Sequence, residues 1–320
     1  MRRVLLACCA WLALWPAAVS AQTDFPNRPV HIVVGFGPGS AADLTARVLS
    51  QRLTQTLGQP FVVEIKPGGG SMVAAEQVAR APKDGYTLFI GTVAVVISSL
   101  LQPNARVNLA KDFAPVSLAT SSSNVLVVKP SLGVSNVKEL IALAKEKPGQ
   151  LNFGTSGFGT SPHLTGELFN MLADTKIVSI HYPGSAQALT DLLGGRIQAM
   201  FSPASTVLGH VESGVLRGLA TSEKARTASA PTLPTVSESG LPGFDTSVWF
   251  GVVAPVGTPQ PVVDKLAAAI GEALKNEEVI KPLKLAGLDV RPMGPAEFGA
   301  YIASETKKYS DVVAGAGLRQ

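Results

Sequence analysis

Short apolar strands alternate with helices along most of the chain, and this alternation limits the possible folds more than any other feature. In the first unit, residues 29–34 form an apolar, β-branched run, and residues 35–40 (Gly-Phe-Gly-Pro-Gly-Ser) interrupt it. Leucine and valine then recur at helical spacing up to Gly58. Strands without polar alternation are typical of parallel sheets that helices cover on both faces. The sequence therefore predicts an α/β fold.

Further units follow in two groups, joined by apolar strands. The expected strands are 61–65, 86–91, 126–128, 151–153, 177–181, 197–201, 216–220 and 248–253. Helices are expected over 71–81 and 135–147, up to residue 172 and up to residue 193, and over 259–274, 277–286 and 295–313. Two such groups predict two lobes, each with a mainly parallel sheet flanked by helices, and a cleft between the lobes. We expect residues 22–122 and 248–320 to form the first lobe and residues 123–247 the second.

The first 21 residues have the pattern of a secretory signal peptide. Residues 1–3 are positively charged, the apolar run 4–15 is too short to span a bilayer, and residues 19–21 are small, as a cleavage site requires. An N-terminal membrane anchor is the alternative. A lipoprotein signal at Cys8 is rejected, because most of the apolar run would follow the lipidated residue. Removal of residues 1–21 also removes Cys8 and Cys9, which are the two cysteines of the sequence. We therefore expect a mature periplasmic protein without cysteines that does not itself span a membrane.

Several classes of function have no support in the sequence. Only 16% of the residues are charged, the formal net charge is +4, and no cluster of Lys and Arg is present, so we expect no nucleic-acid partner. The four histidines lack the paired spacing of metal ligands. There is no G-x-S-x-G motif and no Gly-Lys-Ser/Thr triplet, and residues 35–40 end in serine where a dinucleotide loop has glycine or alanine. We expect no catalytic site, no metal and no cofactor.

Three turns that follow strands share one chemistry. Gly39 and Ser40 precede one helix, residues 160–162 open a second, and residues 184–187 open a third. At each turn a helix presents free backbone N–H groups and the positive end of its dipole, while small residues let a ligand approach. Ordinary helix capping is the alternative for any single turn. Three such turns in two lobes favour a ligand that carries a carboxylate.

The chain resembles the Bug-type periplasmic receptors, which are the solute-binding components of tripartite tricarboxylate transporters. Short collinear segments carry the resemblance: 25–30, 36–40, 57–60, 83–88, 111–116, 159–167, 182–186, 191–195 and 249–251. The resemblance implies two α/β lobes joined by crossing strands. It also implies that main-chain groups and waters hold the carboxylate of the ligand in the cleft.

Carried over residue by residue, the resemblance implies a set of ligand-binding positions. They are Phe36, Gly37, Pro38, Gly39, Ser40, Asp43, Thr92, Ser156, Gly157, Phe158, Gly159, Thr160, Ser161, His163, Tyr182, Gly184, Ser185, Ala186, Gln187 and Ser202. A carboxylate beside an anion site repels an anionic ligand. We therefore expect Asp43 to cap its own helix.

The chain departs from the pattern of this family at positions that are commonly polar or acidic there. These positions are Phe158, Ser202 and the loop expected at residues 92–96 (Thr-Val-Ala-Val-Val). Without an acid at Ser202, the ammonium group of an amino acid loses one candidate partner. Phe158 and the valines favour an apolar ligand body, unless the valines face the core of the lobe. We expect a mono- or dicarboxylate with a hydrocarbon or aromatic body, ahead of aspartate, glutamate or citrate.

The sequence thus predicts a periplasmic receptor that binds a small organic carboxylate. The receptor would deliver this ligand to the membrane subunits of a tripartite tricarboxylate-type transporter. Two alternatives remain: a secreted α/β enzyme, such as a hydrolase or lyase, and a ligand sensor for a signalling partner. The enzyme would need a nucleophile–base pair, and the residue types do not supply one.

Overall fold

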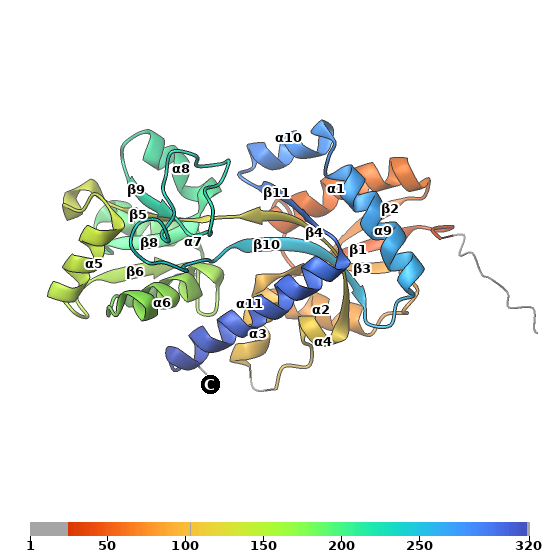
Figure 1. Cartoon of the computed structure of the whole chain (residues 1–320), viewed down its shortest axis with the longest axis horizontal. Helices are drawn as coiled ribbons and strands as arrows, with labels where there is room; N and C mark the ends of the chain where they lie inside the picture. The colour runs from red at the N-terminus through yellow and green to blue at the C-terminus, as the bar shows by residue number, and fades with distance from the viewer. Residues whose placement is uncertain (1–24, 103, 319–320) are drawn as a thin grey trace, which may run out of the picture.

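The computed structural model describes residues 25–102 and 104–318, and these residues form two lobes (Figure 1). The expected signal peptide of residues 1–21 lies outside the described residues. Within them, no helix is long and apolar enough to cross a membrane. The two-lobed α/β architecture predicted from the alternation of strands and helices is confirmed.

The sheet of the first lobe has the strand order β11-β4-β10-β3-β1-β2. Its strands are β1 (Val30–Val34), β2 (Phe61–Ile65), β3 (Thr87–Thr92), β4 (Phe113–Ser122), β10 (Val248–Pro255) and β11 (Asp289–Met293). The helices of this lobe are α1 (Ala41–Leu57), η1 (Gly69–Ser71), α2 (Met72–Ala79), α3 (Val93–Leu101), α4 (Leu109–Asp112), α9 (Gln260–Ala273), α10 (Glu277–Leu285) and α11 (Pro295–Gly315). The sheet thus combines strands from both ends of the chain.

The sheet of the second lobe has the strand order β7-β6-β8-β5-β9. Its strands are β5 (Asn124–Val128), β6 (Asn152–Thr155), β7 (Val178–His181), β8 (Ala199–Pro203) and β9 (Arg217–Thr221). The helices are η2 (Pro130–Leu132), α5 (Val137–Glu146), α6 (Ser161–Ala173), α7 (Ser185–Gly194) and α8 (Ala204–Glu212). All elements of this sheet come from one continuous stretch of chain.

Both sheets are mixed, which corrects the prediction that they are mainly parallel. Parallel pairing is confined to β2-β1-β3 in the first lobe and β7-β6-β8 in the second. Strand β10 runs antiparallel to β3 and β4, and β5 runs antiparallel to β8 and β9. The reason is that each of these strands arrives from the other lobe and enters the sheet from the opposite end.

Strands β4 and β10 carry the chain between the lobes. They pair antiparallel from Val248 opposite Ser122 to Pro255 opposite Phe113 (Figure 1). Trp249 in β10 is wholly buried and belongs to an apolar cluster that includes residues of both lobes. Helix α11 lies along the crossing strands and contacts α3 of the first lobe and α6 of the second. The lobes are therefore joined by two strands and braced by one helix.

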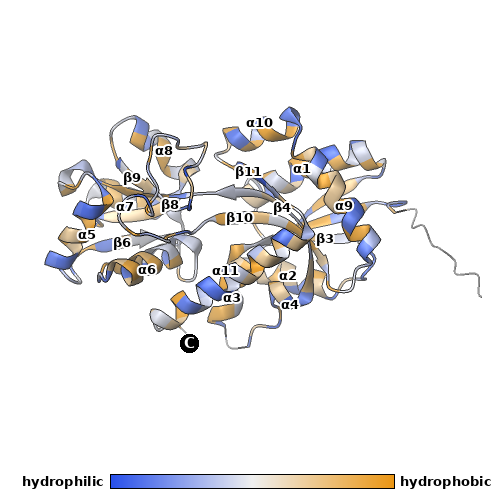
Figure 2. Cartoon of the chain, viewed as in Figure 1, coloured by the Kyte–Doolittle hydropathy of each residue, from blue (hydrophilic) through white to orange (hydrophobic). Residues whose placement is uncertain are grey.

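The helices that cover the sheets are amphipathic. Helix α1, for example, buries Ala42, Ala46, Leu49 and Leu53, which recur at helical spacing. Figure 2 shows apolar and polar residues alternating along α10 and α11. This pattern buries one face of each helix and leaves the other in water.

Candidate ligand-binding site

A cavity of about 490 Å³ lies between the two lobes. Residues of both lobes line it: Phe36, Gly69, Gly70, Thr92, Val93, Ala94, Ser98, Leu101, Gln102, Ser156, Phe158, Gly159, Thr160, Ser161, Pro162, Pro203, Val248 and Phe250. The volume is that of a site for a small molecule. None of these lining residues carries a charge.

Two helix N-termini, one from each lobe, reach the cavity. In the first lobe, Thr92 and the first two residues of α3 line it, and the Thr92 hydroxyl accepts the Ala94 N–H at 3.2 Å. In the second lobe, Thr160 and the first two residues of α6 line it. No side chain caps this end of α6 among the residues that the structure describes. The positive ends of two helix dipoles can therefore attract an anion without any lysine or arginine.

The loop 156–160 between β6 and α6 forms the second-lobe wall of the cavity. Gly157 and Gly159 have φ values of 133° and 71°, in the region that favours glycine. A Cβ atom on Gly159 would lie only 2.6 Å from Leu101 Cδ1 of α3. Because α3 belongs to the first lobe, Gly159 lets the two lobes approach each other at this wall.

Apolar side chains form much of the remaining surface of the cavity. Phe36 and Phe250 come from the first lobe, and Phe158 of the second lobe is 43% exposed. Leu101 and Val248 add aliphatic surface. An apolar ligand body would displace water from these side chains, which stabilises the complex by about 25 cal/mol per Å² of buried apolar surface.

The structure brings only part of the predicted set of residues to the cavity. Those that line it are Phe36, Thr92, Ser156, Phe158, Gly159, Thr160 and Ser161. Those that do not line it are Gly37, Pro38, Gly39, Ser40, Asp43, Gly157, His163, Tyr182, Gly184, Ser185, Ala186, Gln187 and Ser202. Of the three predicted turns, the one before α6 therefore makes the largest contribution to the cavity wall.

At the turn before α1, the carboxylate of Asp43 accepts a backbone N–H that could otherwise bind an anionic ligand. The Ser40 hydroxyl accepts the Asp43 N–H at 3.2 Å, and Asp43 Oδ2 accepts the Gly39 N–H at 2.8 Å. Asp43 Oδ1 also lies 2.7 Å from Arg47 Nε. As expected, Asp43 stabilises the N-terminus of its own helix.

The turn before α7 and the Ser202 position do not line the cavity. The Tyr182 hydroxyl donates to Asp191 Oδ2 at 2.8 Å, and burial together with Asp191 raises the pKa of Tyr182. Ser202 is wholly buried in β8, opposite Val125 of β5. The next residue, Pro203, lines the cavity instead.

Residues 93–96, expected to form a loop, are the first turn of α3. Val95 and Val96 are buried and do not line the cavity, whereas Val93 and Ala94 do. Val93 and Ala94 can therefore contact an apolar ligand body, whereas Val95 and Val96 pack in the core of the lobe. The run of β-branched residues concealed the helix, because such residues also suit a strand or a buried turn.

Several residues that line the cavity are not in the predicted set. Val93, Ala94 and Pro162 belong to segments that the sequence singled out, and the others were missed: Gly69, Gly70, Ser98, Leu101, Gln102, Pro203, Val248 and Phe250. Gly69 and Gly70 follow the carboxyl end of β2, so the rule used for the other turns applies to them as well. Ala94, Ser98, Leu101 and Gln102 recur at helical spacing on one face of α3. Recognising α3 as a helix would have revealed them.

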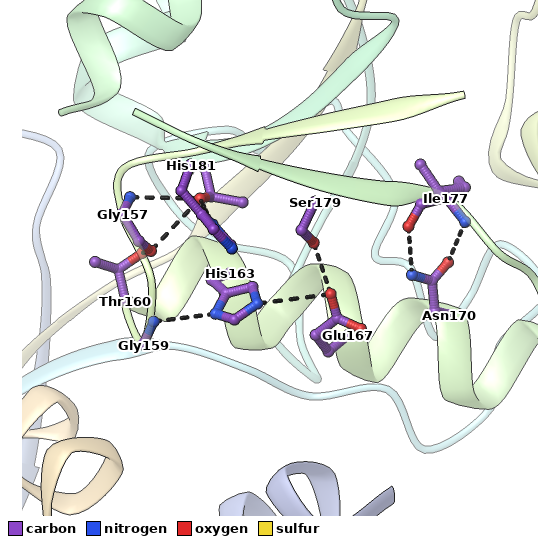
Figure 3. A network of polar contacts seen from close by, with 10 residues as sticks. Gly157, Gly159, Thr160, His163, Glu167, Asn170, Ile177, Ser179 and His181 are labelled. Atoms are coloured by element: carbon purple, nitrogen blue, oxygen red, sulfur yellow. Dashed lines mark hydrogen bonds and ion pairs between the residues drawn. The ribbon is translucent and has the colours of Figure 1, made fainter. Parts of the chain in front are cut away.

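Behind the loop 156–160 lies a polar network (Figure 3). His163 Nδ1 accepts the Gly159 N–H at 3.0 Å, and His163 Nε2 lies 3.6 Å from Glu167 Oε1. The Ser179 hydroxyl donates to Glu167 Oε1 at 2.6 Å. Burial and the neighbouring His181 lower the pKa of His163 to about 4. His163 is therefore neutral at pH 7.

No group of three or more His, Cys, Asp or Glu side chains in residues 25–102 and 104–318 is arranged to hold a metal ion. The polar groups that reach the cavity are hydroxyls, the Gln102 amide and the main chain near the two helix N-termini. These lining residues can therefore bind a ligand through hydrogen bonds and through the helix dipoles.

Comparison with known proteins gives the family. Residues 45–318 match the model of the tripartite tricarboxylate transporter family receptor. The chain is 35% identical to protein BugT of Bordetella pertussis over 305 residues, which cover 95% of this chain and 93% of BugT. It is similar to Rpa4515 of R. palustris, solved with adipate, with 33% identity, a TM-score of 0.78 and coverage of 92% of this chain and 99% of that one. It is also similar to MatC of Rhodopseudomonas palustris, solved with malate, with 31% identity, a TM-score of 0.74 and coverage of 90% and 100%. The chain therefore belongs to the family of tripartite tricarboxylate transporter receptors.

Proposed function

We propose that this protein is a periplasmic receptor that binds a small organic carboxylate in the cavity between its lobes. The observation that carries the proposal is the convergence of the N-termini of α3 and α6 on a cavity without charged lining residues. Such a site suits an anion that is held by main-chain and hydroxyl groups. Membership of a receptor family supports binding rather than catalysis.

We propose that residues 22–122 and 248–320 form one lobe and residues 123–247 the other. The membership of the two sheets supports this division, since β5 to β9 form one sheet and the remaining strands form the other. Residues 1–21 would direct export to the periplasm and be removed there. N-terminal sequencing of the protein from a periplasmic fraction tests this step, with Gln22 as the expected first residue.

The ligand that we propose is a mono- or dicarboxylate with a hydrocarbon or aromatic body. Two relatives were solved with adipate and malate, which supports the carboxylate. The rings of Phe36, Phe158 and Phe250, which line the cavity, support the apolar body. An ammonium group would find no carboxylate among the lining residues, and its desolvation would be costly.

The ligand contacts that we propose are those predicted positions that line the cavity. Thr92, Thr160 and Ser161 would hold the carboxylate near the two helix N-termini, while Phe36 and Phe158 would contact the ligand body. Of the remaining predicted positions, those in the turns before α1, α6 and α7 would act by shaping these turns. Gln102, which follows the C-terminus of α3, would contact a second carboxylate of the ligand.

A panel of carboxylates tests the proposed function. Adipate, hexanoate, benzoate, succinate and glutarate are compared with aspartate, glutamate and citrate by thermal shift and calorimetry. A ligand at 100 times its Kd stabilises the protein by about 2.7 kcal/mol, which gives a clear rise in Tm. Tighter binding of aspartate than of succinate, and of glutamate than of glutarate, would overturn the proposed ligand class. Turnover of a bound carboxylate would overturn the receptor function.

Delivery to a membrane transporter is tested separately. We propose that the partners are the membrane subunits of a tripartite tricarboxylate-type transporter. Vesicles that contain those subunits should take up the carboxylate identified by the panel only when the receptor is added. Binding without any stimulation of uptake would instead favour a ligand sensor.

A further inference from the structure

We propose that His163 is a positioning residue for the ligand-binding loop. In its neutral form, protonated at Nε2, it accepts the Gly159 N–H and holds the loop 156–160 in the shape that lines the cavity. This inference rests on the proposed function only where binding is the measured quantity.

The geometry requires one tautomer of His163. The Gly159 N–H is a donor, so His163 Nδ1, 3.0 Å away, must carry a lone pair. The ring proton then resides on Nε2, which lies 3.6 Å from Glu167 Oε1. Ser179 donates to that same carboxylate oxygen at 2.6 Å and fixes its position (Figure 3). Glu167 and Ser179 thus favour the tautomer that the loop needs.

His163 acts from behind the wall of the cavity. Its side chain is 1% exposed and does not line the cavity, whereas Gly159 does. Within the loop, the Thr160 hydroxyl donates to the Gly157 carbonyl at 2.7 Å, and at its end the Leu164 N–H of α6 donates to the Thr160 carbonyl at 3.0 Å. The bond to His163 ties the N–H of Gly159, near the tip of the loop, to a buried side chain of α6. Loss of this bond would let the tip move relative to Leu101 across the cleft.

Burial and a neighbouring ring keep His163 neutral, against the pull of one acidic neighbour. Glu167 on α6 favours the charged form of the ring, whereas His181 on β7, which packs edge-on with a ring separation of 4.5 Å, disfavours it. The Phe158 ring lies 5.1 Å from the His163 ring and excludes water from one side. Burial and His181 together lower the pKa of His163 to about 4. A second ring proton would oppose the Gly159 N–H and break the bond.

Two variants test the roles of the two ring nitrogens of His163 separately. Asparagine in His163→Asn can place its Oδ1 near the Nδ1 position, so it keeps the acceptor for Gly159. Glutamine in His163→Gln reaches the Nε2 position, so it keeps a partner for Glu167 and loses that acceptor. A residue that merely fills space would show no such difference between the variants.

The first experiment needs no ligand. In the unliganded wild type, ¹⁵N chemical shifts should show His163 Nδ1 without a proton at pH 7. The Gly159 amide should exchange with deuterium on the order of tenfold faster in His163→Gln than in the wild type or His163→Asn, as the loss of one hydrogen bond implies. A proton on Nδ1, or equal exchange in the two variants, would overturn the proposal. If both variants fail to fold, the tautomer of the wild type still decides.

The second experiment measures adipate binding by calorimetry. His163→Gln should bind adipate on the order of tenfold more weakly, while His163→Asn stays within about threefold of the wild type. Equal losses in the two variants would contradict the positioning role. If the wild type binds none of the carboxylates in the panel, the proposed function fails, and the tautomer and exchange measurements still test His163.

Discussion

At the scale of single residues, the lining of the cavity depends on backbone conformations that only glycine adopts easily. Gly159 combines a φ of 71° with a close approach to Leu101 of the other lobe. Gly133, at the end of η2, has a φ of 79° and nothing within 4 Å of its would-be Cβ atom. The two glycines thus share one backbone demand and differ in their contacts.

Replacing these glycines separates backbone strain from contact across the cleft. Gly159→Ala and Gly133→Ala should each lower the free energy of unfolding by about 1 kcal/mol, because alanine is strained at these φ values. Only Gly159→Ala should weaken adipate binding, since only its methyl group meets Leu101. Urea denaturation and calorimetry measure the two effects. Unchanged affinity in Gly159→Ala would show that the added methyl group fits between the loop 156–160 and α3 without disturbing the site.

Glu223 predicts a dependence of stability on pH. Burial is the main reason that its pKa rises from 4.5 to about 7, with Asp289 adding to the shift and Arg291 opposing it. Because the folded-state pKa is the higher one, this contribution to stability is complete below pH 4.5 and is lost as the pH rises through 7.

The variant Glu223→Gln removes this titration and keeps a neutral side chain. Its free energy of unfolding, relative to the wild type, should increase between pH 5 and pH 8 by up to about 3 kcal/mol. Glu212→Gln, at the exposed end of α8, serves as the control and should show no such trend. Parallel pH profiles for the wild type and Glu223→Gln would mean that Glu223 ionises normally.

At the scale of elements, helix α3 joins the core of the first lobe to the cavity. Val95 and Val96 are buried, while Ala94 lies at the cavity in the first turn. A carboxylate at this position would favour the helix N-terminus itself and repel an anionic ligand. The electrostatic role of α3 is therefore open to a direct test.

Ala94→Asp should weaken adipate binding at least tenfold without lowering stability. Two like charges about 4 Å apart repel each other by several kcal/mol at an effective dielectric constant near 20, which exceeds the small gain from the helix dipole. Ala94→Asn, of nearly the same size, is the control for steric effects. Calorimetry on both variants measures the difference, and equal losses would rule out an electrostatic role of this helix end.

Strands with continuous apolar runs could be predicted from the sequence, and so could the helices with clear start signals. Strand β4 could not, because its sequence mixes proline, serine and threonine with few large apolar residues. Its polar side chains are buried, and Thr120 Oγ1 has a partner that only the tertiary fold supplies, Thr45 Oγ1 at 2.9 Å. Because β4 was not predicted, its antiparallel pairing with β10 in the first sheet was not predicted either.

The candidate site, too, could be predicted only in part from the sequence. The turn before α6 could be predicted, because glycine, threonine and proline mark a helix start after a strand. For the turn before α1, the sequence predicted that Asp43 caps the helix, but not that only Phe36 of the turn lines the cavity, because that depends on the tertiary fold. Contacts across the cleft, such as Leu101 against Gly159, depend on how the lobes meet.

At the scale of the whole molecule, two strands and one helix control how the lobes can move. In β10, Trp249 Nε1 donates to Glu305 Oε2 of α11 at 3.0 Å, and Lys308 of α11 donates to the Asp245 carbonyl at 2.7 Å. These bonds join α11 to the crossing strand and to the segment that precedes it. Any change of the angle between the lobes must bend β4 and β10 or shift α11.

Ligand binding should close the lobes around the cavity. A carboxylate held by both α3 and α6 is bound by both lobes at once, so it favours the closed arrangement. Small-angle scattering should show a smaller radius of gyration with saturating adipate than without it. Acetamide, which has no charge, is the control and should leave the scattering curve unchanged. Identical curves with and without adipate would exclude closure.

The strand order of the first lobe has a consequence for folding while the chain is being synthesised. Strand β10, which begins at Val248, lies between β3 and β4, although β4 ends at Ser122. While the chain is still emerging, β3 and β4 therefore have exposed edges that invite pairing with other chains. Strands β5 to β9 complete their own sheet by Thr221, before β10 exists. The second-lobe half of the ligand site can therefore form first, whereas the first-lobe half stays incomplete and prone to wrong pairing until β10 arrives.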